Sequence, residues 1–174
     1  MPAWTDTQLA TAYGALSPAP TSLLAAAKAL NTQTTQITVD VPVQSVAGYL
    51  GNAMKLAGFL AWSASPPAGA SAASIAAATE LAFAFEHPQL FPTFYMSNAA
   101  TATNMESALA ALVSPGTGVT GPITATDQAA IMALASVTVP TWQPEVQTAH
   151  LQRLQRAGLI PSGVVPYPGY TAPA

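Results

Sequence analysis

Apolar residues recur along most of this chain at the three- and four-residue spacing that gives an α-helix one buried face. The longest such stretch covers about residues 45–62, and the others begin at good capping residues such as Ser71 and end near a proline or glycine. Helices are therefore predicted at about residues 5–16, 21–30, 45–62, 71–86, 98–113, 124–135 and 144–157. In the longest one, Gly48, Gly51 and Gly58 lower the helix propensity, and we expect them to allow a neighbouring backbone to approach closely.

Three short segments have a different pattern. Residues 36–41 alternate with a period of two and are rich in β-branched side chains, which predicts a half-buried strand. Residues 90–96 include Pro92 and fit an edge strand at best. Residues 137–140 resemble residues 39–42, since both end in proline, so the two segments are candidates to pair in a small sheet. Chance explains this likeness equally well.

These elements predict a mostly α protein, a compact bundle of six to seven helices with a small β element of two to three strands. No change in composition divides residues 1–160, so we expect a single helical domain there. Residues 161–174 contain four prolines and two tyrosines without periodicity. They are expected to form an extended, proline-rich C-terminal tail.

The chain carries few charges: 6% of its residues are charged, against about a quarter in an ordinary soluble domain. A surface of small and neutral polar residues loses little hydration and side-chain entropy on docking, so it suits burial in an assembly. The net charge is −3 and only four residues are basic, which argues against nucleic acid binding. The most apolar window is too short to span a membrane, and residues 1–6 lack the features of a signal peptide.

No combination of residues predicts chemistry. Residues 116–121 spell G-x-G-x-x-G, but a helix is predicted before them and prolines flank them, so we interpret them as a flexible loop between helices. His87 and His150 have no second metal ligand at helical spacing, and the chain has no cysteine. We therefore expect no catalytic, cofactor-binding or metal-binding residues and no enzymatic activity.

The aromatic residues raise the question of binding surfaces. Five of them fall within thirteen residues, and we expect core packing there, with a binding stripe as the alternative; they are Phe83, Phe85, Phe91, Phe94 and Tyr95. Trp142 follows a proline in an extended segment and is predicted to contact other proteins. In the tail, the predicted interface residues are Val164, Val165, Tyr167 and Tyr170, on a strap laid across a neighbouring chain.

The order of features from residue 5 to residue 142 carries a resemblance. A strand-like segment precedes the long helix, and then come His87-Pro88-Gln89-Leu90, Phe94-Tyr95-Met96-Ser97-Asn98, a helix, Ile123-Thr124-Ala125-Thr126-Asp127 and Val139-Pro140-Thr141-Trp142. This order resembles small Ala-rich helical proteins found in the structural gene clusters of tailed bacteriophages and prophages. The resemblance implies a virion or assembly role and no site residues.

The leading hypothesis is accordingly a bacteriophage virion structural or assembly protein, in the head, the head–tail junction or the tail. It would act through contacts with other virion proteins, as a homo-oligomer or in repeated copies, and be assembled in the host cytoplasm without a cofactor. A bacterial surface or adhesion module is the alternative. A small-ligand or anion binder that uses residues 116–121 is a third reading.

Overall fold

The computed structural model describes residues 4–169, which form eight helices and four short strands. The prediction of a mostly α protein with a small β element is confirmed. The helices are α1 (Asp6–Gly14), α2 (Leu23–Asn31), α3 (Val43–Asn52), α4 (Leu56–Ala64), α5 (Ala72–Glu86), α6 (Ala99–Val113), α7 (Ala125–Ala133) and α8 (Thr148–Arg156).

Helix starts follow local side-chain chemistry. The hydroxyl of Ser71 accepts a hydrogen bond from a backbone N–H in the first turn of α5, and the Asn98 side chain does the same for α6. Thr5 begins α1 and Thr124 begins α7, each in a capping box with the residue three positions later. All four residues stand where the sequence predicts that these helices begin.

The prediction of one helix over residues 45–62 is wrong in one respect, because this segment forms two helices, α3 and α4. The chain breaks between α3 and α4 at Met54, whose φ of 55° lies in the left-handed region. The explanation given for the three glycines also fails. A Cβ atom built on Gly48, Gly51 or Gly58 would meet nothing within 4 Å, so no backbone packs closely there.

The last helix is shorter than predicted. Residues 144–147 are not helical, and α8 begins at Thr148. Instead of starting the helix, Pro144 offers its carbonyl to the indole N–H of Trp4 at 3.1 Å. The predicted end at about residue 157 is confirmed: α8 ends at Arg156, and Gly158 follows it with a φ of 70°.

The strands form two small ladders. β1 (Thr34–Thr38) pairs with β4 (Ser136–Pro140). The proposed pairing of residues 137–140 with residues 39–42 is therefore wrong, because the partner of β4 is the segment that comes just before them. The N–H of Val39 bonds to the carbonyl of Ala135 at one end, and that of Thr141 to Gln33 at the other, so the ladder is antiparallel. The predicted strand over residues 36–41 is interrupted, and its last part belongs to β2 (Val41–Pro42), which pairs antiparallel with β3 (Thr93–Phe94).

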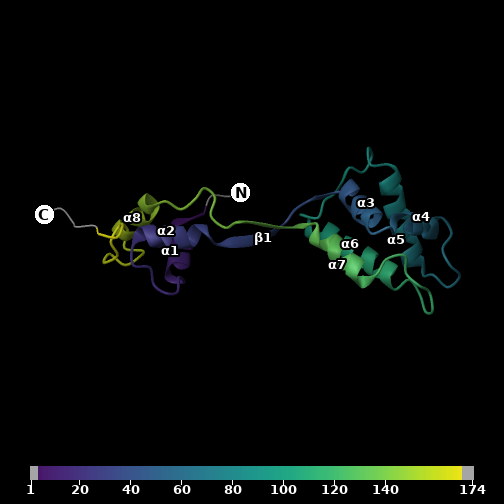
Figure 1. The fold of residues 1–174 in the computed structure, drawn as a ribbon, viewed down its shortest axis with the longest axis horizontal. Helices are drawn as coiled ribbons and strands as arrows, with labels where there is room; N and C mark the ends of the chain where they lie inside the picture. The colour runs from purple at the N-terminus through teal and green to yellow at the C-terminus, as the bar shows by residue number, and fades with distance from the viewer. Residues whose placement is uncertain (1–3, 170–174) are drawn as a thin grey trace. The chain divides into compact units, whose positions relative to one another are not determined.

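Contacts between Cα atoms divide the chain into two compact units. Residues 37–137 form a continuous piece, here called the inserted unit. The described residues before and after it form the discontinuous unit, which is built from α1, α2 and α8 (Figure 1). This grouping differs from the single domain over residues 1–160 that the sequence predicted, and part of the predicted tail belongs to the discontinuous unit.

The core of the discontinuous unit joins side chains that are far apart in the sequence. Leu9 and Tyr13 of α1 and Leu30 of α2 pack with Leu151 and Leu154 of α8. The same cluster includes Leu23, Ala26, Ala27, Trp142, Val146 and Ile160.

Hydrogen bonds of long sequence separation reinforce that core. The Asn31 amide donates to the carbonyl of Val146 at 3.0 Å and accepts the N–H of the same residue at 2.8 Å. The indole N–H of Trp142 donates to the side-chain oxygen of Gln33 at 3.0 Å. These contacts fix the extended segment before α8 against the end of α2.

The inserted unit has its own core between α3, α4, α5, α6 and α7 (Figure 1). Alanines on α5, including Ala77 and Ala78, are buried beside Leu109 and Leu112 of α6. Small side chains let helix axes approach closely, which explains how an Ala-rich sequence forms a packed core here.

Candidate interaction surfaces

The two histidines do not gather reactive partners. His87 follows the last turn of α5, with its ring 4.5 Å from the ring of Phe83. His150 accepts the N–H of Gln147 through Nδ1 as part of the α8 cap, and its ring lies 5.0 Å from that of Trp4. Among residues 4–169, no group of three His, Cys, Asp or Glu side chains is placed to hold a metal ion.

The glycine pattern at residues 116–121 serves packing, and its interpretation as a flexible loop needs correction. A Cβ on Gly116 would lie 2.2 Å from the carbonyl oxygen of Gly69, and one on Gly121 would lie 2.2 Å from that of Leu112. The loop is also held to the start of α5, because the Ser71 N–H donates to the carbonyl of Pro115 at 2.6 Å. Two of the glycines are therefore required because backbone lies against them.

A buried carboxylate, Asp127, links α7 to the break between α3 and α4. It is 2% exposed and accepts a hydrogen bond from the Lys55 ammonium at 2.6 Å and one from the Tyr49 hydroxyl at 3.0 Å. It also accepts the hydroxyl and the N–H of Thr124 at 2.7 and 2.8 Å. Both carboxylate oxygens are thus hydrogen-bonded, Oδ1 to Tyr49 and Oδ2 to Lys55 and Thr124, as a buried charge requires.

The pKa of this carboxyl reflects two opposing effects. Burial by itself raises the pKa of Asp127, because the charged form loses hydration. The hydrogen bonds donated by Lys55 and Thr124, together with that from Tyr49, outweigh burial and hold the pKa well below its usual range. Asp127 is therefore a charged structural link at neutral pH.

The aromatic cluster at the end of α5 divides between core and surface. Phe85 packs against Phe59, with ring centroids 5.6 Å apart, as the core prediction expected. Phe83 and Phe91 do not: they are 45% and 48% exposed and meet edge to face, with centroids 5.6 Å apart. Tyr95 is exposed as well. The sequence prediction of core packing is wrong for these three side chains.

Beside the exposed rings lies a depression that we call the aromatic groove. It consists of two adjoining hollows of about 280 and 190 Å³ that share Glu80 and Phe94. The first is walled by Phe83, Phe91 and Thr93, and the second lies between α5 and α6. Its further lining residues are Ala77, Leu81, Ala84, Thr101, Asn104, Met105 and Ala108.

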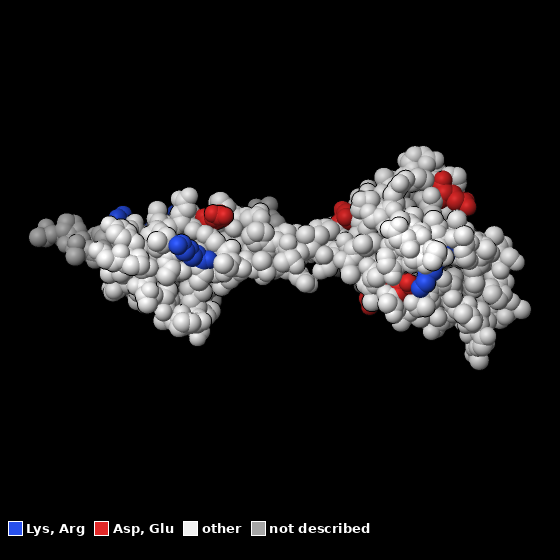
Figure 2. All heavy atoms as spheres, in the orientation of Figure 1, with Lys and Arg blue, Asp and Glu red and all other residues white. Residues whose placement is uncertain are grey.

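The residues that line the groove are mostly apolar, and the charged one among them is an acid. Glu80 lines it, and Glu86 lies further along the same helix. Residues 37–137 hold five acidic side chains and one basic one, a formal charge of −4, and that one base is Lys55, which pairs with Asp127. Only 6% of the residues of the chain are charged, and on the face drawn in Figure 2 they appear as small separate spots.

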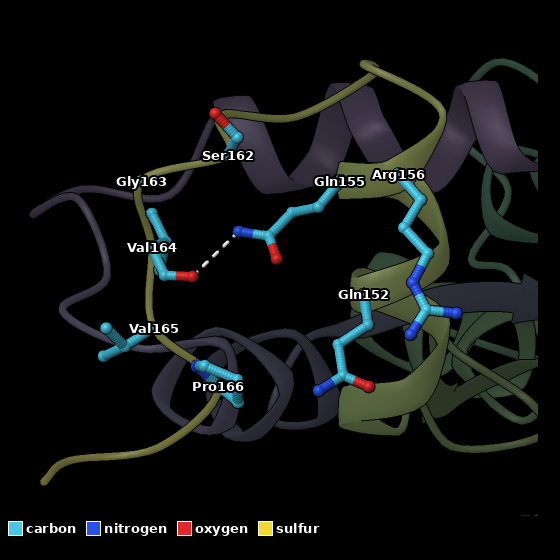
Figure 3. Close-up of a pocket in the computed structure, with 8 residues that line it drawn as sticks. All are labelled: Gln152, Gln155, Arg156, Ser162, Gly163, Val164, Val165 and Pro166. Carbon is cyan, nitrogen blue, oxygen red and sulfur yellow. Dashed lines mark hydrogen bonds between the residues drawn. The ribbon is translucent and has the colours of Figure 1, made fainter. Parts of the chain in front are cut away.

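A second depression, of about 380 Å³, lies in the discontinuous unit between α8 and the tail (Figure 3). One side carries Gln152, Gln155 and Arg156, and the other is formed by residues 162–166. The Gln155 amide crosses it to donate to the carbonyl of Val164 at 2.8 Å. The depression is thus partly closed by a contact within the chain.

The proximal part of the tail is bound to its own chain. The carbonyls of Val165 and Pro166 accept the N–H groups of Leu23 and Leu24 at 2.8 and 3.0 Å. These N–H groups lie in the first turn of α2, where no carbonyl of the same helix is available to them. The prediction that the whole tail lies across a neighbouring chain is therefore corrected for these residues.

The predicted interface residues have different surroundings. Trp142 is only 6% exposed and packs in the core of the discontinuous unit, so the prediction of an exposed contact is corrected by its burial. Val164 is half-buried against that core, and Val165 is partly exposed. Tyr167 is exposed at the surface of the tail. Tyr170 lies outside the described residues.

None of the helices within residues 4–169 is both long enough and apolar enough to cross a membrane. Comparison of the chain with models of known protein families, with curated proteins and with solved structures finds no match.

Proposed function

We propose that the protein is a structural or assembly component of a bacteriophage virion, in the head, the head–tail junction or the tail. The observation that carries the proposal is the aromatic groove. Exposed Phe83 and Phe91 rings beside an apolar depression form a surface of the type that other proteins bury. The surrounding surface has few charges to desolvate, which favours lasting contacts.

The choice of a virion rests on the resemblance of residues 5–142 to small helical proteins of phage structural gene clusters. The contacts described above are compatible with such a role, because the two features that suggested chemistry serve the fold. Asp127 stabilises the inserted unit, and residues 116–121 fit against neighbouring backbone. A component of this kind binds other virion proteins, and copies of itself, without a cofactor.

The test is to look for the protein in intact particles. Particles from a culture of the bacterium that carries the gene are purified on a density gradient and analysed by quantitative mass spectrometry. We expect the protein at a fixed ratio to the major capsid protein through successive gradients. Its recovery with the cell envelope and absence from the particles would instead support a bacterial surface or adhesion module.

A variant identifies the contact surface in the same experiment. Phe83→Ser combined with Phe91→Ser removes both exposed rings, and we expect at least a tenfold loss of the protein from particles, because aromatic anchors dominate interfaces. Leu159→Ser is the matched control, since Leu159 is equally exposed but lies in the discontinuous unit. Equal incorporation of both variants would show that the groove is not the contact.

A further inference from the structure

We infer that the exposed rings of Phe83 and Phe91 dock into a hollow at the start of α2 in a second copy of this chain. The inference rests on the proposed function, because a virion component present in repeated copies meets its own surface. It goes further by naming the partner of the two rings and the place where they bind.

The receiving site, here called the α2 hollow, belongs to the discontinuous unit and has a volume of about 310 Å³. It is lined by residues 16–21, which connect α1 to α2, and by Ala25 and Ala29 of α2. None of these residues is charged. The volume is that of a site for a small ligand, so an aromatic side chain fits into it.

The walls of the α2 hollow are held in place by contacts within the discontinuous unit. Leu16 packs against the core of that unit. Ser22, which follows residues 16–21, is buried and caps α2 with its hydroxyl. The N–H of Leu23 donates to the carbonyl of Val165 at 2.8 Å. Because the hollow is already formed, little conformational entropy is lost when a side chain enters it.

The rings of Phe83 and Phe91 suit this site. They meet edge to face and are each about half exposed, so they present one apolar surface. Large aromatic side chains that fill a pocket of the partner are the usual anchors of protein interfaces. The hollow offers them mainly alanine and proline, whose side chains lose no rotamer freedom on burial.

The distribution of charge favours a contact between unlike units of two copies. The inserted unit has a formal charge of −4, whereas residues 1–36 and 138–174 hold three basic and two acidic side chains, a formal charge of +1. Within residues 4–169, the ion pairs use Lys55 and Arg153. The other two bases, Lys28 and Arg156, both belong to the discontinuous unit. The inserted unit of one copy therefore attracts the discontinuous unit of another.

Lys28 and Glu80 bring this attraction to the contact itself. Lys28 is exposed and follows Ala25 by three residues on α2, so it lies at the edge of the α2 hollow. Glu80 is exposed and precedes Phe83 by three residues on α5, so it lies beside the rings. When the rings enter the hollow, Lys28 of one copy can pair with Glu80 of the other.

The arrangement is a head-to-tail contact, since the rings belong to the inserted unit and the α2 hollow to the discontinuous unit. Such contacts are not self-complementary, so each copy keeps one pair of rings and one hollow for further neighbours. They produce closed rings of subunits where the rotation closes and open chains where it does not.

Two half-defective chains test this directly. One carries Phe83→Ser and Phe91→Ser and keeps its α2 hollow, and the other carries Ala29→Trp, which fills the hollow, and keeps its rings. By sedimentation velocity, we expect the wild type to self-associate as its concentration rises and each defective chain to do so about tenfold more weakly. An equimolar mixture of the two should form a 1:1 complex and stop there.

The matched control for the filled hollow is Ala157→Trp. Ala157 is also an exposed alanine of the discontinuous unit, but it does not line the α2 hollow. This variant should self-associate like the wild type. Thermal melting of each chain checks that it is folded.

Reversal of charge gives a second measurement. Lys28→Glu and Glu80→Lys should each weaken self-association by about fivefold, because like charges then face each other. A chain with both changes should recover most of the loss, which a merely structural role of either residue would not produce. Arg156→Glu changes the net charge equally but does not alter the lining of the hollow, and should weaken association by less than about twofold.

Several results would overturn the inference. Self-association of either half-defective chain at wild-type strength would do so, and so would a mixture without a complex. A wild type that stays monomeric over the whole concentration range would show that the rings have no partner in a second copy. A chain with both charge changes that associates no better than the single variants would show that Lys28 and Glu80 do not face each other.

These outcomes are separable from the proposed function. If the wild type is found in particles and the Phe83/Phe91 variant is lost from them, but the mixing experiment gives no complex, the exposed rings bind a different virion protein. The inference then fails while the proposed function stands.

Discussion

The two units of this protein are stabilised in different ways although they share one Ala-rich, sparsely charged sequence. The inserted unit is continuous and relies on five helices packed through small side chains, with one buried carboxylate, Asp127, in its interior. The discontinuous unit brings together two segments more than a hundred residues apart, and fixes them with hydrogen bonds such as those of Asn31 and Trp142. The two distant segments are thus held together by specific hydrogen bonds. Helices that follow one another in the sequence are held together by the fit of their side chains.

The largest effect is expected from the two cores. Leu109→Ala and Leu151→Ala each remove a side chain that is at most 1% exposed, and each should lower the stability of its unit by about 3–4 kcal/mol. We expect the consequences to differ, because the two segments of the discontinuous unit are connected by the residues of the inserted unit. Leu151→Ala should leave a separate calorimetric transition for the inserted unit. Leu109→Ala should lower the melting temperature of both.

Hydrogen exchange by residue provides the check on that comparison. Protection of α3, α5 and α6 should persist in Leu151→Ala, and protection of α1, α2 and α8 should be lost in Leu109→Ala. Equal and independent losses from the two variants would show that the units do not depend on each other in this order.

The second effect concerns the charge inside the inserted unit. Asp127→Asn removes the ion pair with Lys55 and weakens the cap of α7, which should cost about 2–4 kcal/mol at pH 7. Because the folded-state pKa of Asp127 is lowered, its contribution is complete above the unfolded-state value of about 3.9 and is lost as the pH falls further.

Urea unfolding of wild type and Asp127→Asn at pH 7, 5, 4, 3 and 2 measures this contribution. The difference in unfolding free energy should stay constant down to about pH 4 and shrink below it. A difference that grows as the pH falls would mean that the pKa of Asp127 is raised by folding.

The third effect concerns the polar links of the discontinuous unit. Asn31→Ala leaves the N–H and carbonyl of Val146 without their partner, which should cost about 1–3 kcal/mol. The control is Asn52→Ala at the exposed end of α3, which should change the stability by less than about 0.5 kcal/mol. Similar losses in chemical denaturation from both variants would contradict the importance of these links.

The smallest effect is expected from the exposed ion pair between Arg153 and Asp6. Both side chains are about half exposed, so Arg153→Gln should cost at most about 1 kcal/mol. Thermal melting in 1 M NaCl should abolish the difference from wild type, because salt screens exposed charges. The cost of Asp127→Asn should persist in the same salt, which would sharpen the contrast between the two ion pairs.

The sequence predicts those features that depend on contacts between residues close together in the chain. Ser71, Asn98 and Thr124 begin helices because their side chains meet backbone N–H groups a few residues away. The break between α3 and α4 escapes prediction, because Met54 carries the left-handed conformation without the glycine or proline that usually marks it. The division into two units depends on contacts between distant segments, which periodicity does not report.

The same limit applies to the candidate surfaces. Periodicity places Phe83 and Phe85 on different faces of α5, but it does not tell which face another element covers. Phe85 meets Phe59 in the core, and Phe83 meets the rings of Phe91 and His87 at the surface. The composition of the tail predicted that it docks on a neighbouring chain. Its first part instead docks on α2 of the same chain, whose N–H groups donate to Val165 and Pro166.

The hydrogen bond between Val39 and Ala135 has a consequence for how the protein is made. As the chain leaves the ribosome, α1 and α2 emerge first. Their apolar faces stay uncovered until α8 is synthesised, more than a hundred residues later. If residues 37–137 were still unfolded, closing a loop of that length would cost about 4 kcal/mol in chain entropy. Once they fold, the bond from Val39 to Ala135 holds their two ends together, and α8 arrives already beside the helices it must cover.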